Sequence, residues 1–483
     1  MTWEFLPRTP WCIASVSVTF LALGLLIYSS SLQNSFIDFD DGSLITENPI
    51  VRENSWSSVV QAFKTYDPEL YAPLTTLSYK LNHLIGGAEP YSYHLGNLLL
   101  HTLNALLVAW FLILLTGKRA IGLIAGLLFL MHPIHTEAVA WAAARKDVLS
   151  AIFFLASLIA YLAHHQRKTK NQQTNNKSTM RYVYGMYLLS LTFFFLGLLS
   201  KVTIIFLPFI LLLIDWYQGR SIDRKALKEK ILYVILSIIF LVIAFYGKTA
   251  RVAYGSYVWE KFLLACRSIT FSLEKLIIPK DFSVLYPYSN DIQLTNPDLL
   301  LSLFFVIALS IIVFLLAKRT KLPLFLWGFF LLTLLPSFGG LTREHTSVIE
   351  FYIASDRYAY LPSISFFLIV ALALATVIER KRLFGLALML LVLLSLSFLS
   401  YRQSNVWKDT ETLYRHVAAV EPDSQVAHLK IAEAHLSRGE FAEAKTSFEA
   451  SVQAHPNGGA SYYLGLLALQ SGKREEAKQA FRD

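Results

Sequence analysis

Cysteine is almost absent from this sequence. Only Cys12 and Cys266 occur in 483 residues, which is too few and too scattered for a disulfide framework or a thiolate metal site. The sequence also contains no glycine-rich phosphate loop, no GxSxG elbow and no CxxC pair. Nucleotide hydrolysis, serine hydrolysis and dithiol redox chemistry therefore have no local support.

Charge is also scarce. Asp, Glu, Lys and Arg make up 16% of the residues, whereas 55% are hydrophobic, and the mean hydropathy is +0.47. A soluble chain of this size would have too little polar surface to cover its core, so we expect a polytopic protein in a lipid bilayer. The net charge of +9 does not indicate nucleic acid as a partner, because the Lys and Arg residues fall in short clusters between apolar runs.

Apolar runs that could cross a bilayer occur at about eleven places. They lie near residues 11–31, 93–116, 120–136, 147–164, 182–199, 202–217, 231–247, 297–317, 322–338, 359–378 and 383–400. The basic clusters lie at 118–119, 167–181, 220–230, 318–321 and 380–382. All five clusters then fall on one side, which the positive-inside rule makes cytoplasmic.

The remaining connections fall on the other, non-cytoplasmic side. They include the first long loop at 32–92, which we expect to form a lid or floor for a pocket, and the corner at 132–147. The segment 258–279 is apolar but interrupted by charges, so we expect it to lie at the membrane interface. The first apolar run is predicted to be an uncleaved anchor with a cytoplasmic N-terminus.

The C-terminal part has a different pattern. Small residues with Gly439, Phe448 and Pro456 follow tetratricopeptide-repeat spacing over 425–456, and the pattern recurs 33 residues later. We therefore divide the chain into a membrane domain at 1–402 and a repeat region at 403–483. The sequence stops within a second helix, so we expect a truncated or very short array.

Three acids follow the first apolar run, at Asp38, Asp40 and Asp41. A carboxylate beside apolar walls and a like charge has a raised pKa, which suits a general base. The alternative is a solvated cap at the end of the span. We favour the catalytic reading, with Asp40 as the base, because charge at a membrane edge is costly and is usually functional.

The corner at 132–147 contains His132, His135 and Glu137, followed by Arg145. Two histidines and a glutamate could bind a divalent cation, but this is not the HExxH pattern and Pro133 prevents a regular helix. A hydrogen-bonded turn that caps the span is the alternative. We interpret the turn as orienting a substrate, with Arg145 offered to a phosphate.

Two further cations, Lys201 and Arg357, flank apolar runs on the non-cytoplasmic side. The positive-inside rule gives no reason for them there, so an anionic ligand explains them better than membrane anchoring does. Arg343 and His345 are weaker candidates.

Several motifs together resemble a known family. They are YAPLTTL at 71–77, HLGNLLLHTLNALL at 94–107, HPIHTEAVAW and ARKDVLS within 132–150, GLLSK at 197–201 and DRYAYLP at 356–362. In this order, with repeats at the C-terminus, they resemble bacterial relatives of the transmembrane and tetratricopeptide-repeat (TMTC) proteins, which in turn resemble protein O-mannosyltransferases of the GT-C fold.

The resemblance implies a mainly helical chain, with a polytopic GT-C-like domain followed by a repeat solenoid. It also implies a bacterial inner-membrane location, an acidic pair in the first outer loop at Asp40 and Asp41, and a polyprenyl-phosphate sugar donor. The acceptor would be a protein bound by the repeats. Mannosyltransferases often have Asp-Glu where this chain has Asp-Asp, so the sugar and the acceptor remain open.

Three functions follow for comparison. The first is transfer of a hexose, such as mannose, to Ser or Thr of a protein on the non-cytoplasmic face. The second is a membrane-anchored repeat scaffold without catalysis. The third, a transporter or flippase, would need charges near the bilayer midplane, whereas the charges of this sequence gather at one face.

Overall fold

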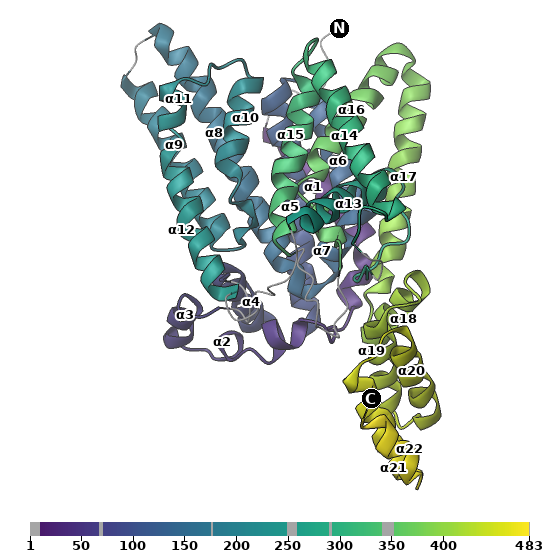
Figure 1. The fold of residues 1–483 in the computed structure, drawn as a ribbon. Coiled ribbons are helices and arrows are strands. Elements are labelled where there is room, and N and C mark those ends of the chain that lie inside the picture. Colours follow the sequence, from purple (N-terminus) through teal and green to yellow (C-terminus); the bar gives the residue numbers. More distant parts are fainter. Residues whose placement is uncertain are drawn as a thin grey trace.

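The computed structural model describes residues 10–66, 71–174, 177–248, 258–288, 292–340 and 352–482. These residues are mainly helical, and their one β-type pairing is an isolated bridge between Pro287 and Tyr352. Figure 1 shows long helices side by side in a bundle, with the C-terminal helices extending from one end of it. The predicted helical membrane domain and C-terminal solenoid are both present.

Helices of different lengths form the bundle. They are α1 (Pro10–Ile27), α5 (Pro90–Thr116), α6 (Arg119–Met131), α7 (Thr136–Ala140), α8 (Arg145–Thr174), α9 (Lys177–Leu198), α10 (Leu207–Tyr217), α12 (Ile231–Lys248), α14 (Pro297–Ala317), α15 (Leu322–Leu334), α16 (Ser363–Arg380) and α17 (Arg382–Val406). Within the described ranges, six helices are long and apolar enough to cross a membrane, and a bent pair adds a seventh. Four shorter apolar helices complete a one-to-one match with the predicted spans. The chain is a multi-pass membrane protein.

The bent pair begins the corner that carries the HPIHTE motif. α6 ends at Met131, and the following helical residues 133–140 run at 55° to it. Proline has no N–H to continue the helix and forces the preceding residue out of the helical region. His132 is accordingly extended, with φ −79° and ψ 130°. The break predicted at Pro133 is confirmed.

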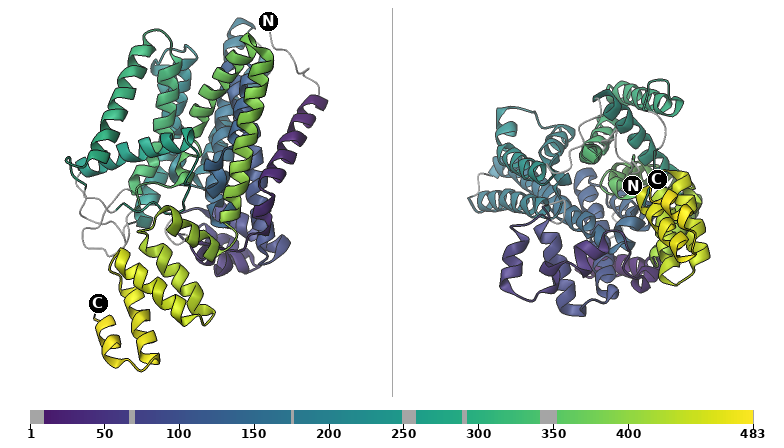
Figure 2. Two further views of the ribbon diagram at one scale, coloured as in Figure 1. Left: turned by 90° about the vertical axis from the view of Figure 1, so that its right-hand side faces the viewer. Right: turned by 60° about the horizontal axis from the view of Figure 1, so that its bottom comes forward.

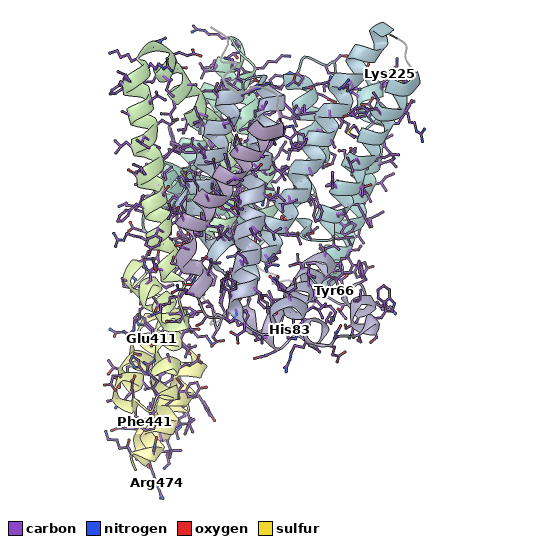
Figure 3. The ribbon with its side chains drawn as sticks, turned by 180° about the vertical axis from the view of Figure 1, so that it is seen from behind. Tyr66, His83, Lys225, Glu411, Phe441 and Arg474 are labelled. Atoms are coloured by element: carbon purple, nitrogen blue, oxygen red, sulfur yellow. The ribbon has the colours of Figure 1, made fainter. Side chains whose placement is uncertain are left out.

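The two ends of the bundle differ in their loops. One end carries α11 (Arg224–Lys228), and the other carries α2 (Pro49–Arg52), α3 (Trp56–Ala62) and α4 (Pro73–Gly86) of the first loop. Figure 3 shows Lys225 at one end, with Tyr66, His83 and Glu411 toward the other. α13 (Val258–Ile277) runs crosswise to the long helices in Figure 1, and its position at a membrane interface stays a prediction.

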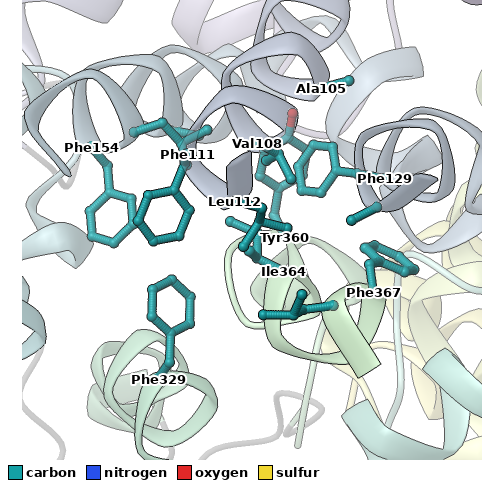
Figure 4. Close-up of a cluster of buried hydrophobic side chains, with 14 of the residues drawn as sticks. Ala105, Val108, Phe111, Leu112, Phe129, Phe154, Phe329, Tyr360, Ile364 and Phe367 are labelled. Atoms are coloured by element: carbon teal, nitrogen blue, oxygen red, sulfur yellow. The ribbon is translucent and has the colours of Figure 1, made fainter. Parts of the chain in front are cut away.

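The bundle is organised around α5, which packs against α1, α6 and α8. Figure 4 shows part of this core, where Phe111 and Phe154 lie against Phe329, and Phe129 lies against Tyr360. Burial falls toward the periphery: the most apolar window is 67% buried in the helix at 142–167, but 17% buried in α14. A helix that is apolar all round and exposed on most of its surface is suited to face lipid.

The repeat region consists of α18 (Thr410–Val420), α19 (Gln425–Ser437), α20 (Phe441–Ala454), α21 (Gly458–Gln470) and α22 (Arg474–Ala480). Figure 2 shows these helices stacked at the end that carries the first loop. α17 continues to Val406, so the boundary predicted after residue 402 falls inside a helix. A separate apolar core joins the first loop, the 140–144 corner and the first two repeat helices.

Candidate functional site

Six charged side chains gather where the first loop meets the bundle. They are Asp40, Glu137, Lys146, Asp147, Lys201 and Arg357, and direct ion pairs or electrostatic interactions connect them. Four of the predicted site residues belong to this set. The first loop, the corner between α7 and α8, the end of α9 and the short helical turn Asp356–Ala359 each contribute to it. We call this set the charged cluster.

Glu137 holds Arg357 by two groups. One carboxylate oxygen pairs with the guanidinium, and the other accepts a hydrogen bond from the Arg357 backbone N–H at 2.8 Å. The guanidinium carbon also lies 5.3 Å from the centre of the Trp141 ring. Since Glu137 is buried, it would be costly there without a partner. The pair therefore fixes Arg357 at the edge of the charged cluster.

Lys201 and Asp147 form a second ion pair, in which each side chain is only 8% exposed. The ammonium contacts Oδ1 of Asp147. The other oxygen, Oδ2, is buried and has no hydrogen-bond partner among the described residues. Buried polar atoms are normally satisfied, so this oxygen is available to a donor on a ligand.

Lys146 is the cation without a fixed partner. It is partly exposed, and no hydrogen bond or ion pair joins it to a residue in the described part of the chain. It interacts electrostatically with Asp40 and Asp147, which attract it, and with Lys201 and Arg357, which repel it. A cation in this position can bind an incoming anion without first breaking an ion pair. Sequence reasoning passed over Lys146 in favour of its neighbour.

Asp40 and Asp41 differ sharply in environment. Asp41 is fully buried, and its carboxylate accepts hydrogen bonds from the backbone N–H groups of Ile37 at 2.8 Å and Ala143 at 2.9 Å. Burial raises the pKa of Asp41 to about 7, while the two backbone donors act in the opposite direction. Asp41 thus ties the first loop to the corner, whereas Asp40 is partly exposed at the charged cluster.

Arg145 points away from the charged cluster. Its side chain is 2% exposed, and each guanidinium nitrogen donates to protein, with Asn97, Asn82 and the Tyr93 carbonyl as acceptors. Successive residues at a helix start point in different directions, which explains why Arg145 and Lys146 diverge. A phosphate could reach Arg145 only by displacing these acceptors, so the placement does not agree with a phosphate contact at the rim.

His132 and His135 lie behind the charged cluster and are buried. His135 contacts the Phe129 carbonyl at 2.7 Å and the Ser363 hydroxyl at 3.0 Å. His132 contacts the Leu276 carbonyl at 3.2 Å, and its other ring nitrogen accepts from a backbone N–H. The contacts of both rings therefore agree with the alternative of a hydrogen-bonded turn that caps the span. Across the described ranges, no group of three or more His, Cys, Asp or Glu residues could hold a metal ion.

Asp356 directly precedes Arg357 and is held in place by Tyr286. Its buried carboxyl accepts from the Tyr286 hydroxyl at 2.9 and 3.0 Å, one distance to each oxygen. Burial raises the pKa of Asp356 well above its usual range. The weaker candidates Arg343 and His345 lie outside the described residues.

The repeat region matches a family model described as "Tetratricopeptide repeat" over residues 426–458, which confirms the predicted repeats. Among solved structures, an Archaeoglobus fulgidus oligosaccharyltransferase tethered with an acceptor peptide aligns with 83% of this chain and 55% of its own. Its TM-score is 0.43 and its sequence identity is 14%.

Relatives with the name protein O-mannosyl-transferase match part of the chain. Human TMTC2 is 40% identical over 150 residues, which are 30% of this chain and 18% of that protein. Xenopus laevis tmtc2 is 41% identical over 152 residues, with the same shares covered. Mouse TMTC4 is 30% identical over 190 residues, covering 34% of this chain and 25% of that protein. The chain thus matches less than a fifth of the TMTC2 proteins, and over that part the resemblance to the TMTC proteins that its motifs predict is confirmed.

Proposed function

We propose that this chain is a membrane glycosyltransferase that moves a sugar from a lipid-linked phosphate to a hydroxyl group of a protein. One observation carries the proposal: a partly exposed acid, Asp40, shares a cluster with Lys146, a cation that has no fixed partner. Sugar transfer from a phosphate needs both a base for the acceptor and a cation for the departing phosphate.

The proposed reaction is a single displacement. Asp40 takes the proton from a Ser or Thr hydroxyl, and the hydroxyl oxygen forms a bond to the anomeric carbon of the sugar. The bond from that carbon to the phosphate oxygen breaks, and the phosphate keeps the electron pair. Lys146, together with Lys201 and Arg357, stabilises the negative charge on the phosphate. Attack from the side opposite the phosphate inverts the anomeric configuration.

The ion pairs define what each cation contributes. Lys201 is bound to Asp147 and Arg357 to Glu137, so these two supply oriented but partly neutralised charge. Lys146 interacts with Asp40 and Asp147 only at longer range, so it supplies charge that no direct ion pair within the described residues neutralises. Arg145, His132 and His135 are proposed to hold the corner in shape and to make no contact with substrate, since their nitrogens already bind protein groups.

The donor is proposed to be a polyprenyl phosphate carrying a hexose. The relatives are named protein O-mannosyl-transferases, which favours mannose as the sugar. The helices of the first loop, the loop that carries Asp40, lie at the end of the bundle opposite the basic helix α11. The positive-inside rule supports a non-cytoplasmic position for that end. In a bacterium this is the outer face of the inner membrane, where the repeats would meet an acceptor protein.

A membrane-anchored repeat scaffold without catalysis is the alternative. The test uses the purified chain in lipid, mannosyl-phosphoryl-polyprenol and a Ser/Thr peptide. Asp40→Asn should lower the transfer rate by about 10²–10⁴-fold, the usual contribution of a general base. The control is Glu47→Gln, which changes an exposed acid of the same loop and should transfer at the wild-type rate. Equal, measurable rates in the wild type and Asp40→Asn would remove Asp40 as the base, and absence of transfer by the wild type would leave the scaffold.

A further inference from the structure

Trp141 contacts three separate parts of the molecule. Its ring stacks on Trp407, with centroids 6.0 Å apart and planes 19° apart. On other sides it meets Phe39 at 5.3 Å and the guanidinium carbon of Arg357 at 5.3 Å. Phe39 immediately precedes Asp40, and Trp407 joins α17 to the first repeat helix. One buried ring thus connects the repeats with the charged cluster.

The repeats are also bound directly to the first loop. The Ser35 N–H donates to the Lys408 carbonyl at 2.8 Å, and the Asp38 N–H donates to the Thr410 hydroxyl at 2.9 Å. Asp38 forms an ion pair with Lys430 of α19 at 2.9 Å. These contacts hold the segment just before Asp40 against α18 and α19.

Apolar contact carries most of this docking. Asp38 is 70% exposed, and an ion pair in water contributes little. In contrast, Trp141, Trp407 and Tyr414 are at most 2% exposed and share one core with Ile37 of the first loop. Large buried aromatic rings dominate the energetics of such contacts.

We propose that Trp407 is a positioning residue: by stacking on Trp141 it holds Arg357 and the Asp40 loop in the geometry for transfer. This inference rests on the proposed function. The first repeat helices then belong to the framework of the active site and do more than recruit the acceptor. Arg357 has many rotamers, and Glu137 restrains only part of its side chain. The contact of the guanidinium with the Trp141 ring restrains it further, and stacking on Trp407 fixes the position of that ring.

The test compares Trp407→Leu, which keeps an apolar side chain, with Trp407→Phe, which keeps a ring. Transfer is measured to a short Ser/Thr peptide that does not need the repeats for binding. Trp407→Leu should lower kcat about tenfold or more, since small misplacements of reacting groups are costly, with little change in the peptide KM. Trp407→Phe should stay within a few-fold of the wild type. The matched control is Trp56→Leu, since Trp56 lies in the first loop but is 78% exposed.

A second measurement does not depend on activity. Hydrogen exchange of residues 36–46 and 352–361 should accelerate in Trp407→Leu and remain at the wild-type level in Trp56→Leu. Unchanged exchange together with an unchanged kcat would overturn the inference, as would an effect confined to the KM of a large acceptor protein. If the wild type transfers no sugar, the proposed function fails, and the exchange data alone decide whether Trp407 holds the loop.

Discussion

The carboxylate of Glu137 binds both the backbone N–H and the guanidinium of Arg357, although 220 residues separate the two in the sequence. The contact connects the corner after α6 with the turn before α16. This ion pair fixes one side of the charged cluster, whereas Asp40 and Lys146 are more exposed and can meet a substrate.

Replacing Glu137 by Gln should destabilise the protein. The amide keeps the size of the side chain but leaves the Arg357 guanidinium without its counter-charge at a largely buried position. We expect a loss of roughly 2–4 kcal/mol, seen as a lower midpoint in thermal unfolding followed by tryptophan fluorescence. An unchanged midpoint would mean that the pair does not hold the corner.

Lys201 and Asp147 should show strong coupling. Lys201→Met leaves a buried carboxylate unpaired, and we expect it to cost about 3 kcal/mol. The double variant Lys201→Met/Asp147→Asn removes both charges and should recover much of that stability. Thermal unfolding of the two single variants and the double variant measures the coupling. Additive losses would show that the two side chains do not interact as the ion pair implies.

The same double variant separates stability from chemistry. Its transfer rate should stay low, because the cation proposed to assist the departing phosphate is absent. A double variant that transfers at the wild-type rate would remove Lys201 from the proposed reaction.

Asp41 should make stability depend on pH. Burial raises its folded-state pKa from 3.8 to about 7, so the folded state holds a proton that the unfolded state releases. The stabilising contribution is then fully present below pH 4 and is lost as the pH rises through about 7. Melting temperatures between pH 4 and 8 should fall over this window, and the component from Asp41 should vanish in Asp41→Asn. The same slope in both proteins would contradict the expected titration.

Gly122 should tolerate no side chain where α6 crosses α5. A Cβ atom there would lie 2.6 Å from the Ala109 carbonyl oxygen and 3.0 Å from the Ile113 backbone nitrogen, and backbone atoms cannot move aside cheaply. Gly122→Ala should therefore reduce the free energy of unfolding by about 1–3 kcal/mol, the usual cost of overpacking, and lower the unfolding midpoint by several degrees. Gly185→Ala is the control, because nothing lies within 4 Å of its added Cβ atom.

The spans could be predicted because each is a local apolar run, and Pro133 marked the sharp break between α6 and α7. The proximity of Glu137, Lys201 and Arg357 could be predicted only in part, because the sequence indicated no more than that they share one side of the membrane. The sequence could not tell which of Arg145 and Lys146 faces the cluster, since both begin the same helix. Helix α4 in the first loop also went unpredicted, although Pro73 begins it and Gly87, with a φ of 61°, ends it.

The docking of the repeats on the first loop lies beyond pattern reasoning altogether. Asp38 and Thr410 are 372 positions apart, and neither belongs to a sequence pattern that predicts contact with the other. Asp38 could be recognised as an acid at the end of a span, but only the fold shows that it faces α19. Long-range contacts of this kind depend on how completed elements pack together.

The central claim is that Asp40 and Lys146 serve one reaction in different roles. The most direct test measures binding of polyprenyl phosphate to Asp40→Asn and Lys146→Met, beside sugar transfer by the same two proteins. We predict that Asp40→Asn binds the lipid phosphate as well as the wild type does but transfers sugar about 10²–10⁴-fold more slowly, whereas Lys146→Met is impaired in both. Wild-type binding and transfer by Lys146→Met, or loss of lipid-phosphate binding by Asp40→Asn, would contradict the account.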